Sequence, residues 1–102
     1  MGILYREAAR LIGPYGRKGG KSNRKKQCRR MLEFIDHLEK HELKVKEWRH
    51  IGRRHVIRYY KRHRSLSPRT IEQHYYAIRR LFEILEIPHE VPVPDYSLHG
   101  LD

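Results

Sequence analysis

Residues 67–85 read SPRTIEQHYYAIRRLFEIL and carry the clearest helical signal in the chain. Ser67 is suited to cap such a helix, and Pro68 is suited to its first helical position. The apolar side chains of one face recur at 4-3-4-3 spacing: Ile71, Tyr75, Ile78, Phe82 and Leu85. The opposite face would present a polar row: Arg69, Gln73, Tyr76 and Arg80. This stretch therefore predicts a helix that packs one face into a core and offers the other to a partner or to solvent.

A shorter helix is expected near the N-terminus, over residues 3–12. Four side chains form its apolar stripe: Leu4, Ala8, Leu11 and Ile12. Gly13 and Pro14 should end this helix, because proline has no N–H to donate and restricts the residue before it. Residues 13–21 would then form a Gly-rich basic loop.

Two more helices are expected in the middle of the chain. The second helix should run from Ser22, as its N-cap, to about His41. Phe34 should flank its buried face, which holds apolar residues at helical spacing: Cys28, Met31, Leu32, Ile35 and Leu38. The third helix should run from roughly Arg53 to His63, with one side for the core: Val56, Tyr59, Tyr60 and His63.

Two segments carry no helical period. Residues 42–48 alternate apolar and polar residues and predict an extended connector that covers the core with Leu43, Val45 and Trp48. Residues 86–102 contain three prolines and are typical of a linker or an ordered arm. We therefore predict an all-α protein, a small four-helix bundle with a Gly-rich basic N-terminal loop and a Pro-containing C-terminal tail. Its domain should span residues 1–90, and residues 91–102 should form the linker or tail.

The chain is strongly basic and its charge is unevenly placed. It holds 23 Lys and Arg against 12 Asp and Glu, a net charge of +11. Residues 17–30 carry eight basic side chains and no acid, acids gather in 33–47, and basic residues return in 49–64. Such an excess favours a polyanionic partner, because each phosphate contact releases counterions. Nucleic acid fits better than a membrane, since no segment joins a basic face to a large apolar one or approaches the ~20 apolar residues of a membrane span.

The stretch GRKGGKS at residues 16–22 is similar to a nucleotide-binding P-loop but departs from its pattern. A P-loop needs G-x-x-x-x-G-K-[ST] after a strand, whereas Tyr15 stands at the first glycine position and the preceding segment is helical. We therefore expect no nucleotide site. The loop could hold a DNA phosphate at the start of the second helix, or it could be a flexible connection. Both readings stay open.

The sequence contains no convincing set of metal or cofactor ligands. Cys28 is the only cysteine, which excludes an internal disulfide. His37 and His41 have the spacing of a metal-binding pair, but the H-E-x-x-H pattern fails and no third ligand is evident. We expect them to be a solvated pair. No metal, cofactor or small-molecule substrate is predicted.

Residues 49–64 read RHIGRRHVIRYYKRHR and contain H-x-x-R twice, at residues 50–53 and 55–58. Those residue types, with tyrosines close behind, are used by strand-cutting recombinases. Helical phase nevertheless places Tyr59 and Tyr60 on the core side of the third helix, where tyrosine usually packs. We expect a structural role for these tyrosines.

Three stretches resemble the N-terminal core-binding, SAM-like domain of tyrosine recombinases (phage integrases). They are GKSNRKKQCRRMLEFIDHL, WRHIGRRHVIRYYKRH and LSPRTIEQHYYAIRRLFEIL. The matching positions are Ser22, Phe34 and Leu38, then Ile51, His55, Val56 and Tyr59, then Ser67, Thr70, Ile71, Ala77, Ile78 and Arg79. The similarity covers about residues 20–90. It implies a four-helix bundle that clamps one side of duplex DNA at a site-specific recombination site.

The resemblance also implies which side chains contact DNA. On the second helix they are Lys21, Ser22, Arg24, Lys25, Lys26 and Arg29. On the fourth helix they are Arg69, Thr70, Gln73 and Arg80. Charge and helical phase select the same surfaces independently. The outward side of the third helix adds positive field for secondary backbone contacts: Arg53, Arg54, Arg58, Lys61 and Arg62.

One departure from the family is large. Family catalysis uses an Arg, a Lys, an H-x-x-R, a further His or Trp and a nucleophilic Tyr, all in a C-terminal domain larger than this chain. Only about sixteen residues follow the fourth helix, so we expect a non-catalytic DNA-binding domain that does not cut DNA. Its expected partners are double-stranded DNA and other recombinase protomers, in the nucleoid of the cytoplasm. A stand-alone regulatory or architectural DNA-binding protein and an RNA-binding protein are the alternatives.

Overall fold

The computed structural model describes residues 2–17 and 21–100, without the side chain of Lys21. Four α-helices and two short 3-10 helices follow one another along the chain: α1 Ile3–Arg17, α2 Lys21–His41, η1 Trp48–His50, α3 Arg53–Arg62, α4 Pro68–Ile84 and η2 Tyr96–Leu98. Within the described ranges there is no strand. The predicted all-α class and four-helix bundle are confirmed.

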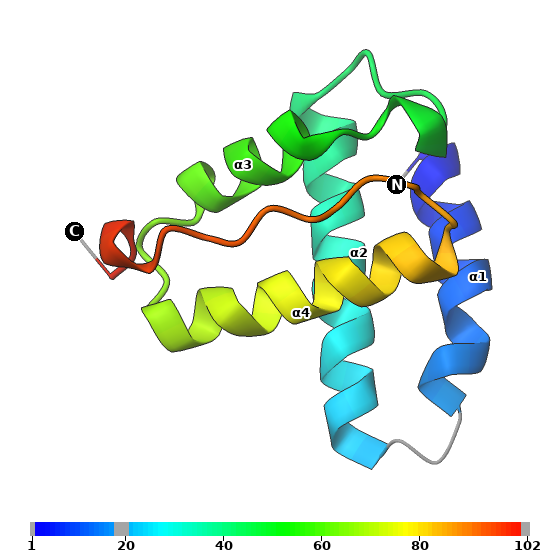
Figure 1. Cartoon of the computed structure of the whole chain (residues 1–102). Coiled ribbons are helices and arrows are strands. Elements are labelled where there is room, and N and C mark those ends of the chain that lie inside the picture. The colour runs from blue at the N-terminus through cyan, green and yellow to red at the C-terminus, as the bar shows by residue number, and fades with distance from the viewer. Residues whose placement is uncertain (1, 18–20, 101–102) are drawn as a thin grey trace.

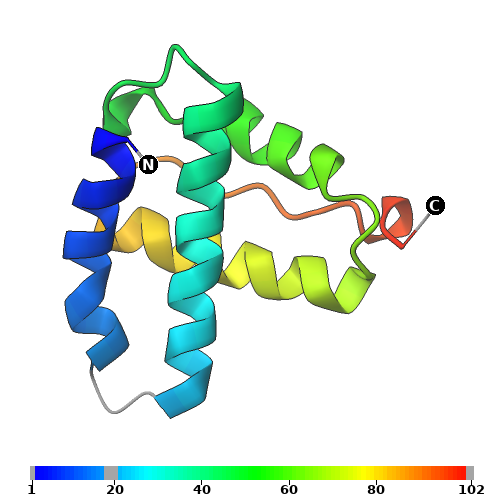
Figure 2. The same ribbon diagram turned by 180° about the vertical axis from the view of Figure 1, so that it is seen from behind.

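The helices form two pairs that lie across each other. α1 and α2 run antiparallel, side by side, and α4 crosses both of them (Figure 1). α3 and α4 form a second antiparallel pair joined by a short loop. Figure 2 shows that α2 covers one face of this second pair, while the segment after α4 returns between α3 and α4 on the other face.

The core lies where the four helices meet. Its fully buried side chains come from every helix and from the connector before α3: Ala8, Met31, Phe34, Ile35, Leu38, Ile51, Val56, Tyr59, Ile71, Ala77, Ile78 and Leu81. Phe34 is at the centre, with its ring 5.2 Å from that of Tyr59 and 6.5 Å from that of Phe82. The prediction that Phe34 only flanks the buried face is wrong, because α2 is covered by α1 on one side and by α3 and α4 on the other.

α1 continues past the predicted stop at Gly13 and Pro14 and ends at Arg17. Proline in a helix removes one hydrogen bond and strains the preceding turn. Contacts from α2 hold that turn in place. The hydroxyl of Tyr15 is hydrogen-bonded to the Gln27 side chain, and Arg24 Nη1 donates to the Tyr15 carbonyl at 3.1 Å. Of the predicted loop 13–21, residues 13–17 are therefore helical and residues 18–20 lie outside the described part.

The predicted helix starts are right for the second pair of helices and wrong for α2. Ser67 caps α4 by accepting a hydrogen bond from the Thr70 N–H at 3.2 Å, with Pro68 at the first helical position. α3 begins after Gly52. Ser22 is not the cap of α2, because the helix already begins at Lys21 and Ser22 lies in its first turn.

The connector between α2 and α3 is a turn followed by η1, and not the extended connector that the alternation of apolar and polar residues predicts. The Val45 N–H donates to the Glu42 carbonyl at 2.9 Å, which closes the turn. Val45 is buried, and Trp48 is half-buried with its indole N–H 2.9 Å from a Glu7 carboxylate oxygen, so both cover the core as predicted. Leu43 does not, because the turn leaves 69% of it exposed.

The C-terminal end of α4 reverses the chain direction. The Ile87 N–H donates to the Phe82 carbonyl at 2.9 Å, and the Glu86 N–H donates to the Glu83 carbonyl at 3.2 Å. This hydrogen-bond pair is the Schellman motif, which requires a left-handed residue at its turn. Glu86 supplies it with a φ of 57°. The motif sends the chain back across α3 and α4.

The segment after this reversal, residues 87–100, is an ordered arm. Ile87 and Val91 are buried, and the Tyr60 hydroxyl donates to the Pro92 carbonyl at 2.8 Å. At its far end the Gly100 N–H donates to the Arg64 carbonyl at 2.8 Å. The arm is thus part of the folded bundle, in agreement with a radius of gyration of 13.1 Å, near the ~13 Å of a 100-residue domain.

Candidate nucleic-acid interface

The polar row of α4 lies on the side of the helix that faces away from the core. Arg69 and Arg80 are exposed, and 42% of Tyr76 is exposed. Thr70 and Gln73 are half-buried beside them. The predicted phase of this helix is therefore right, and its row is accessible along the whole length of α4.

Arg80 and a basic side chain from α2 both lie beside the ring of Tyr15. The guanidinium of Arg80 lies 5.5 Å from the centre of the Tyr15 ring, and that of Arg24 lies 4.5 Å from the same point. Tyr15 itself is fixed by its hydrogen bond to Gln27. We call Tyr15, Arg24, Gln27 and Arg80 the Tyr15 corner. It joins the last turn of α1, the first turns of α2 and the second half of α4 (Figure 1).

The charges of the Tyr15 corner are only lightly neutralised. Arg80 Nη1 lies 2.8 Å from a Glu83 carboxylate oxygen, but both side chains are at least half exposed. An exposed ion pair of this kind contributes roughly 0–1 kcal/mol, so a phosphate could replace the carboxylate at little expense. Arg24 forms no ion pair with any residue in the described ranges. The corner can therefore offer two guanidinium groups to one anionic backbone.

The other candidates on α2 lie elsewhere. Lys25 and Arg29 line a hollow between α1 and α2 together with Glu33 and Asp36. On a helix, Lys25 lies about 100° around the axis from Arg24. The structure thus does not bring these two side chains to the Tyr15 corner. Ser22 and Lys26 are exposed, whereas the side chain of Lys21 lies outside the described residues.

Arg30 was not among the predicted contacts, yet it lies close to the crossing of α2 with α4. Burial, together with the smaller effects of the nearby Arg30 charge and of His63, lowers the pKa of His74 to about 4. The Arg30 charge also favours the ionised form of the Tyr59 hydroxyl. Burial has the stronger, opposite effect, so the pKa of Tyr59 is raised. It was missed because it belongs to a run of eight similar residues, and only the crossing of the helices distinguishes it.

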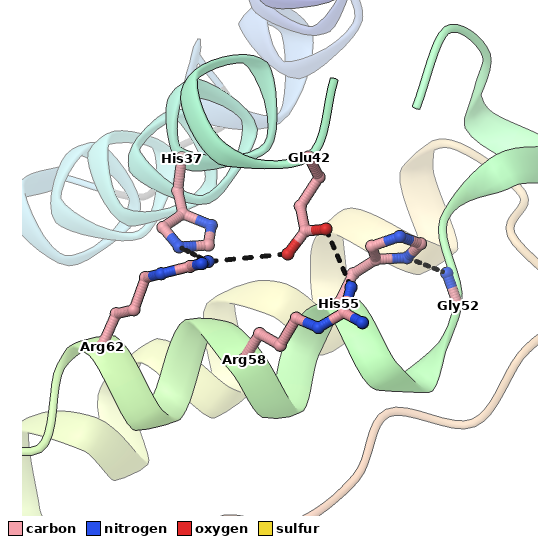
Figure 3. A network of polar contacts seen from close by, with 6 residues as sticks. All are labelled: His37, Glu42, Gly52, His55, Arg58 and Arg62. Atoms are coloured by element: carbon pink, nitrogen blue, oxygen red, sulfur yellow. Dashed lines mark hydrogen bonds and ion pairs between the residues drawn. The ribbon is translucent and has the colours of Figure 1, made fainter. Parts of the chain in front are cut away.

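The basic side chains of α3 divide into two groups. Arg53, Arg54 and Lys61 are exposed, as predicted. Arg58 and Arg62 are also partly exposed, but both reach back to Glu42 at the end of α2 (Figure 3). Arg58 Nη1 is 2.9 Å and Arg62 Nη1 is 3.5 Å from the carboxylate of Glu42, which is 9% exposed. Part of the charge predicted for DNA is thus used inside the bundle.

Both histidines of the H-x-x-R matches are bound to backbone. His55 Nδ1 accepts the Gly52 N–H at 2.9 Å and stabilises the start of α3 (Figure 3). His50 Nδ1 accepts the Lys46 N–H at 3.1 Å. His55 is buried, and burial lowers its pKa. These contacts explain the two histidines by their structural roles.

The tyrosines that follow are core residues, as predicted. Tyr59 is fully buried and its hydroxyl lies 2.9 Å from Nδ1 of His74. Tyr60 is 5% exposed and donates to the arm. Burial raises the pKa of both hydroxyls well above the usual range. Neither oxygen is placed to act as a nucleophile.

Three histidines surround Tyr59 at the junction of α2, α3 and α4. The ring centres of His37, His63 and His74 lie 5.1, 4.2 and 5.8 Å from that of Tyr59. The predicted solvated pair of His37 and His41 is wrong, because His37 is 6% exposed. Burial lowers the pKa of His37 to about 4, with smaller effects from His41 and Arg62. This cluster could not be predicted from the spacing of histidines along the chain, since its members come from three different parts of the bundle.

Within the described part of the chain, no three His, Cys, Asp or Glu side chains are arranged to hold a metal ion. The cluster around Tyr59 is packed with aromatic and imidazole rings and flanked by arginines, which disfavours a cation. No helix among residues 2–17 and 21–100 is long and apolar enough to cross a membrane.

No family model matches the chain, and comparisons with curated proteins and with solved structures found no match.

Proposed function

We propose that this protein binds duplex DNA through the Tyr15 corner and the polar row of α4, as a non-catalytic core-binding domain of the tyrosine recombinase type. One observation carries the proposal. Arg24 and Arg80, 56 positions apart in the sequence, lie beside the same tyrosine ring on the accessible side of the bundle. A planar guanidinium can bind a phosphate through two hydrogen bonds, so the pair suits a DNA backbone.

The polar row of α4 extends this contact toward the bases. At 1.5 Å per residue, the distance from Arg69 to Arg80 along the helix is about 16 Å, more than the ~12 Å width of a major groove. Arg80 at one end would bind a backbone phosphate. Gln73 and Arg69 are residue types that read base edges with two hydrogen bonds. The polar row could therefore both position the protein on the DNA backbone and read the base sequence.

The non-catalytic part of the proposal is supported by the core. The two tyrosine hydroxyls nearest to the H-x-x-R matches, those of Tyr59 and Tyr60, are buried and hydrogen-bonded. A recombinase nucleophile has to reach a DNA phosphate, which these oxygens cannot do without unfolding α3. The link to a recombination site, and to other protomers on DNA, rests on the resemblance alone. A regulatory or architectural DNA-binding protein would use the same surface.

Fluorescence anisotropy with a labelled 30-base-pair duplex tests the proposal. We expect wild-type affinity to fall steeply with salt, with a logarithmic slope of about −4.5 to −7, as for roughly 5–8 phosphate contacts. The double variant Arg24→Ala/Arg80→Ala should reduce the slope by about 2 and weaken binding by roughly 10-fold or more. Lys25→Ala/Arg29→Ala is the matched control, because it removes the same charge from the other side of α2.

The comparison of the two double variants decides the result. Equal losses from both would mean that only net charge matters, and the Tyr15 corner would not be the contact. Circular dichroism should show unchanged helicity for both. Single-stranded RNA is the competitor that separates the alternatives, since an RNA-binding protein would prefer it to the duplex.

A further inference from the structure

An apolar groove lies between α3 and the C-terminal arm, away from the Tyr15 corner. Its walls are formed by five apolar residues: Ile57, Tyr60, Pro92, Val93 and Leu98. Three of them are unusually exposed for their type, at 39% for Ile57, 61% for Val93 and 51% for Leu98. We call this feature the arm groove. Apolar side chains gathered in this way on a small protein indicate a binding surface more often than scattered ones do.

The rim of the arm groove is positively charged. Lys61 and Arg64 line it, and neither has a carboxylate partner among the described residues. Asp95 is the one acid at the rim among the residues that the structure describes, and its carboxylate accepts hydrogen bonds from the Ser97 N–H at 3.2 Å and hydroxyl at 2.6 Å. His99 is bound to the His63 carbonyl through Nδ1 at 3.3 Å. The rim therefore presents two cations against one exposed carboxylate, so its charge is positive on balance.

We propose that the arm groove binds a short segment of another protein that carries apolar side chains next to carboxylates. The apolar walls suit leucine-like or aromatic side chains, and the rim suits acids on either side of them. A nucleic-acid backbone fits poorly, because Ile57, Val93 and Leu98 have no donor to offer a phosphate. A second copy of this chain fits poorly too, since two chains of net charge +11 repel each other.

The arm groove and the Tyr15 corner can be occupied at the same time. The corner joins the last turn of α1 to α2 and α4, whereas Pro92, Val93 and Leu98 of the groove belong to the arm, whose last part runs toward the end labelled C in Figure 1. A partner segment in the groove would leave the guanidinium groups of Arg24 and Arg80 accessible. This inference therefore stands or falls independently of DNA binding.

Selection from a displayed library of random 12-residue peptides tests the inference, with the full chain as bait. We expect enriched peptides to combine Asp or Glu with Leu, Ile, Phe or Val. A basic protein selects acids in any case, so the place of binding is the decisive measurement. A synthetic copy of the most enriched peptide should shift the backbone amide NMR signals of residues 57–64 and 93–99.

Variants complete the test. Val93→Asp/Leu98→Asp should weaken the peptide at least about 10-fold, whereas Leu43→Asp, at a comparably exposed apolar residue on another side, should leave its affinity unchanged. Lys61→Glu/Arg64→Glu should also weaken it, in contrast to Lys44→Glu/Lys46→Glu. The inference is overturned if no peptide is enriched, or if Val93→Asp/Leu98→Asp leaves binding intact. It is equally overturned if sedimentation shows a dimer that the same variant dissociates.

Discussion

Tyr59 on α3 and His74 on α4 are joined by a hydrogen bond of 2.9 Å in a place where both rings are buried. With His74 neutral and its proton on Nε2, its Nδ1 accepts a hydrogen bond from the Tyr59 hydroxyl, and its Nε2 lies 4.0 Å from a Glu33 carboxylate oxygen. His37, next to Tyr59, is held in the same form, because its Nε2 accepts from Arg62 Nη1 at 3.2 Å. Protonation of His37 would break its hydrogen bond with Arg62, and protonation of His74 would place a positive charge in this buried cluster.

Stability should therefore fall in mild acid. The pKa of both His37 and His74 is about 4 in the folded chain, against about 6.5 when unfolded. Between these values the unfolded chain binds more protons, so the free energy of unfolding decreases as pH falls from about 6.5 to 4. We expect a loss of a few kcal/mol, measured from urea unfolding between pH 7 and pH 4. His37→Gln/His74→Gln should flatten this dependence, whereas exposed His89→Gln should preserve it.

Glu42→Gln should destabilise the protein by about 1–2 kcal/mol at pH 7. The carboxylate of Glu42 is nearly buried and faces Arg58 and Arg62 together, so its loss leaves two guanidinium groups beside an uncharged amide. Both arginines are partly exposed, which limits the effect. Glu47→Gln is the control, because Glu47 is 56% exposed and its pairs should contribute less than about 0.5 kcal/mol. Equal urea midpoints for the two variants would contradict the assigned role of Glu42.

Glu86→Gly should stabilise the protein by about 0.5–1 kcal/mol. Glu86 holds the left-handed position of the Schellman motif with a φ of 57°, a conformation that costs residues with a Cβ about 1 kcal/mol. Glycine adopts it without strain, although it gains flexibility in the unfolded chain. Glu83→Gly, one turn earlier in α4, should instead destabilise by about 1 kcal/mol. Thermal unfolding of both variants at one pH measures the difference.

No covalent protein–DNA adduct should form with a nicked duplex that traps recombinase intermediates. The hydroxyls of Tyr59 and Tyr60 donate inside the bundle, and burial raises their pKa values, so neither is available to attack a phosphate. Denaturing gel electrophoresis would reveal an adduct as a band of lower mobility. A band that disappears in Tyr59→Phe would contradict the structural role assigned to this residue.

The sequence predicts well what is decided locally. α3 and α4 begin and end within a residue or two of expectation, because Ser67 and Pro68 mark a start and the apolar period marks a face. The exposed row of α4 follows from the same period. These features depend on neighbours within one or two turns, which the sequence displays directly.

What depends on how helices cross could not be predicted. In the sequence, Pro14 predicts the end of a helix. In the structure, the helix continues because Arg24 and Gln27 from α2 hold the next turn. The spacing along α2 predicts Phe34 at the edge of the buried face. In the structure it is fully buried, because α3 and α4 cover its side of α2. The joining of Arg24 with Arg80, and the gathering of His37, His63 and His74, link residues from different helices, and no spacing along the chain encodes such a meeting.

The C-terminal arm has a consequence for the dynamics of α3. That helix has ten residues, shorter than the ~12–15 at which an isolated helix becomes even marginally stable. Its inner side contacts α2, Tyr60 in its last turn is hydrogen-bonded to Pro92 of the arm, and Arg64, two residues after the helix, accepts from the Gly100 N–H. Release of the arm should therefore also open α3, and the two segments should exchange their amide hydrogens as one cooperative unit. The α1–α2 hairpin, whose two helices pack against each other, should retain its protection through that opening.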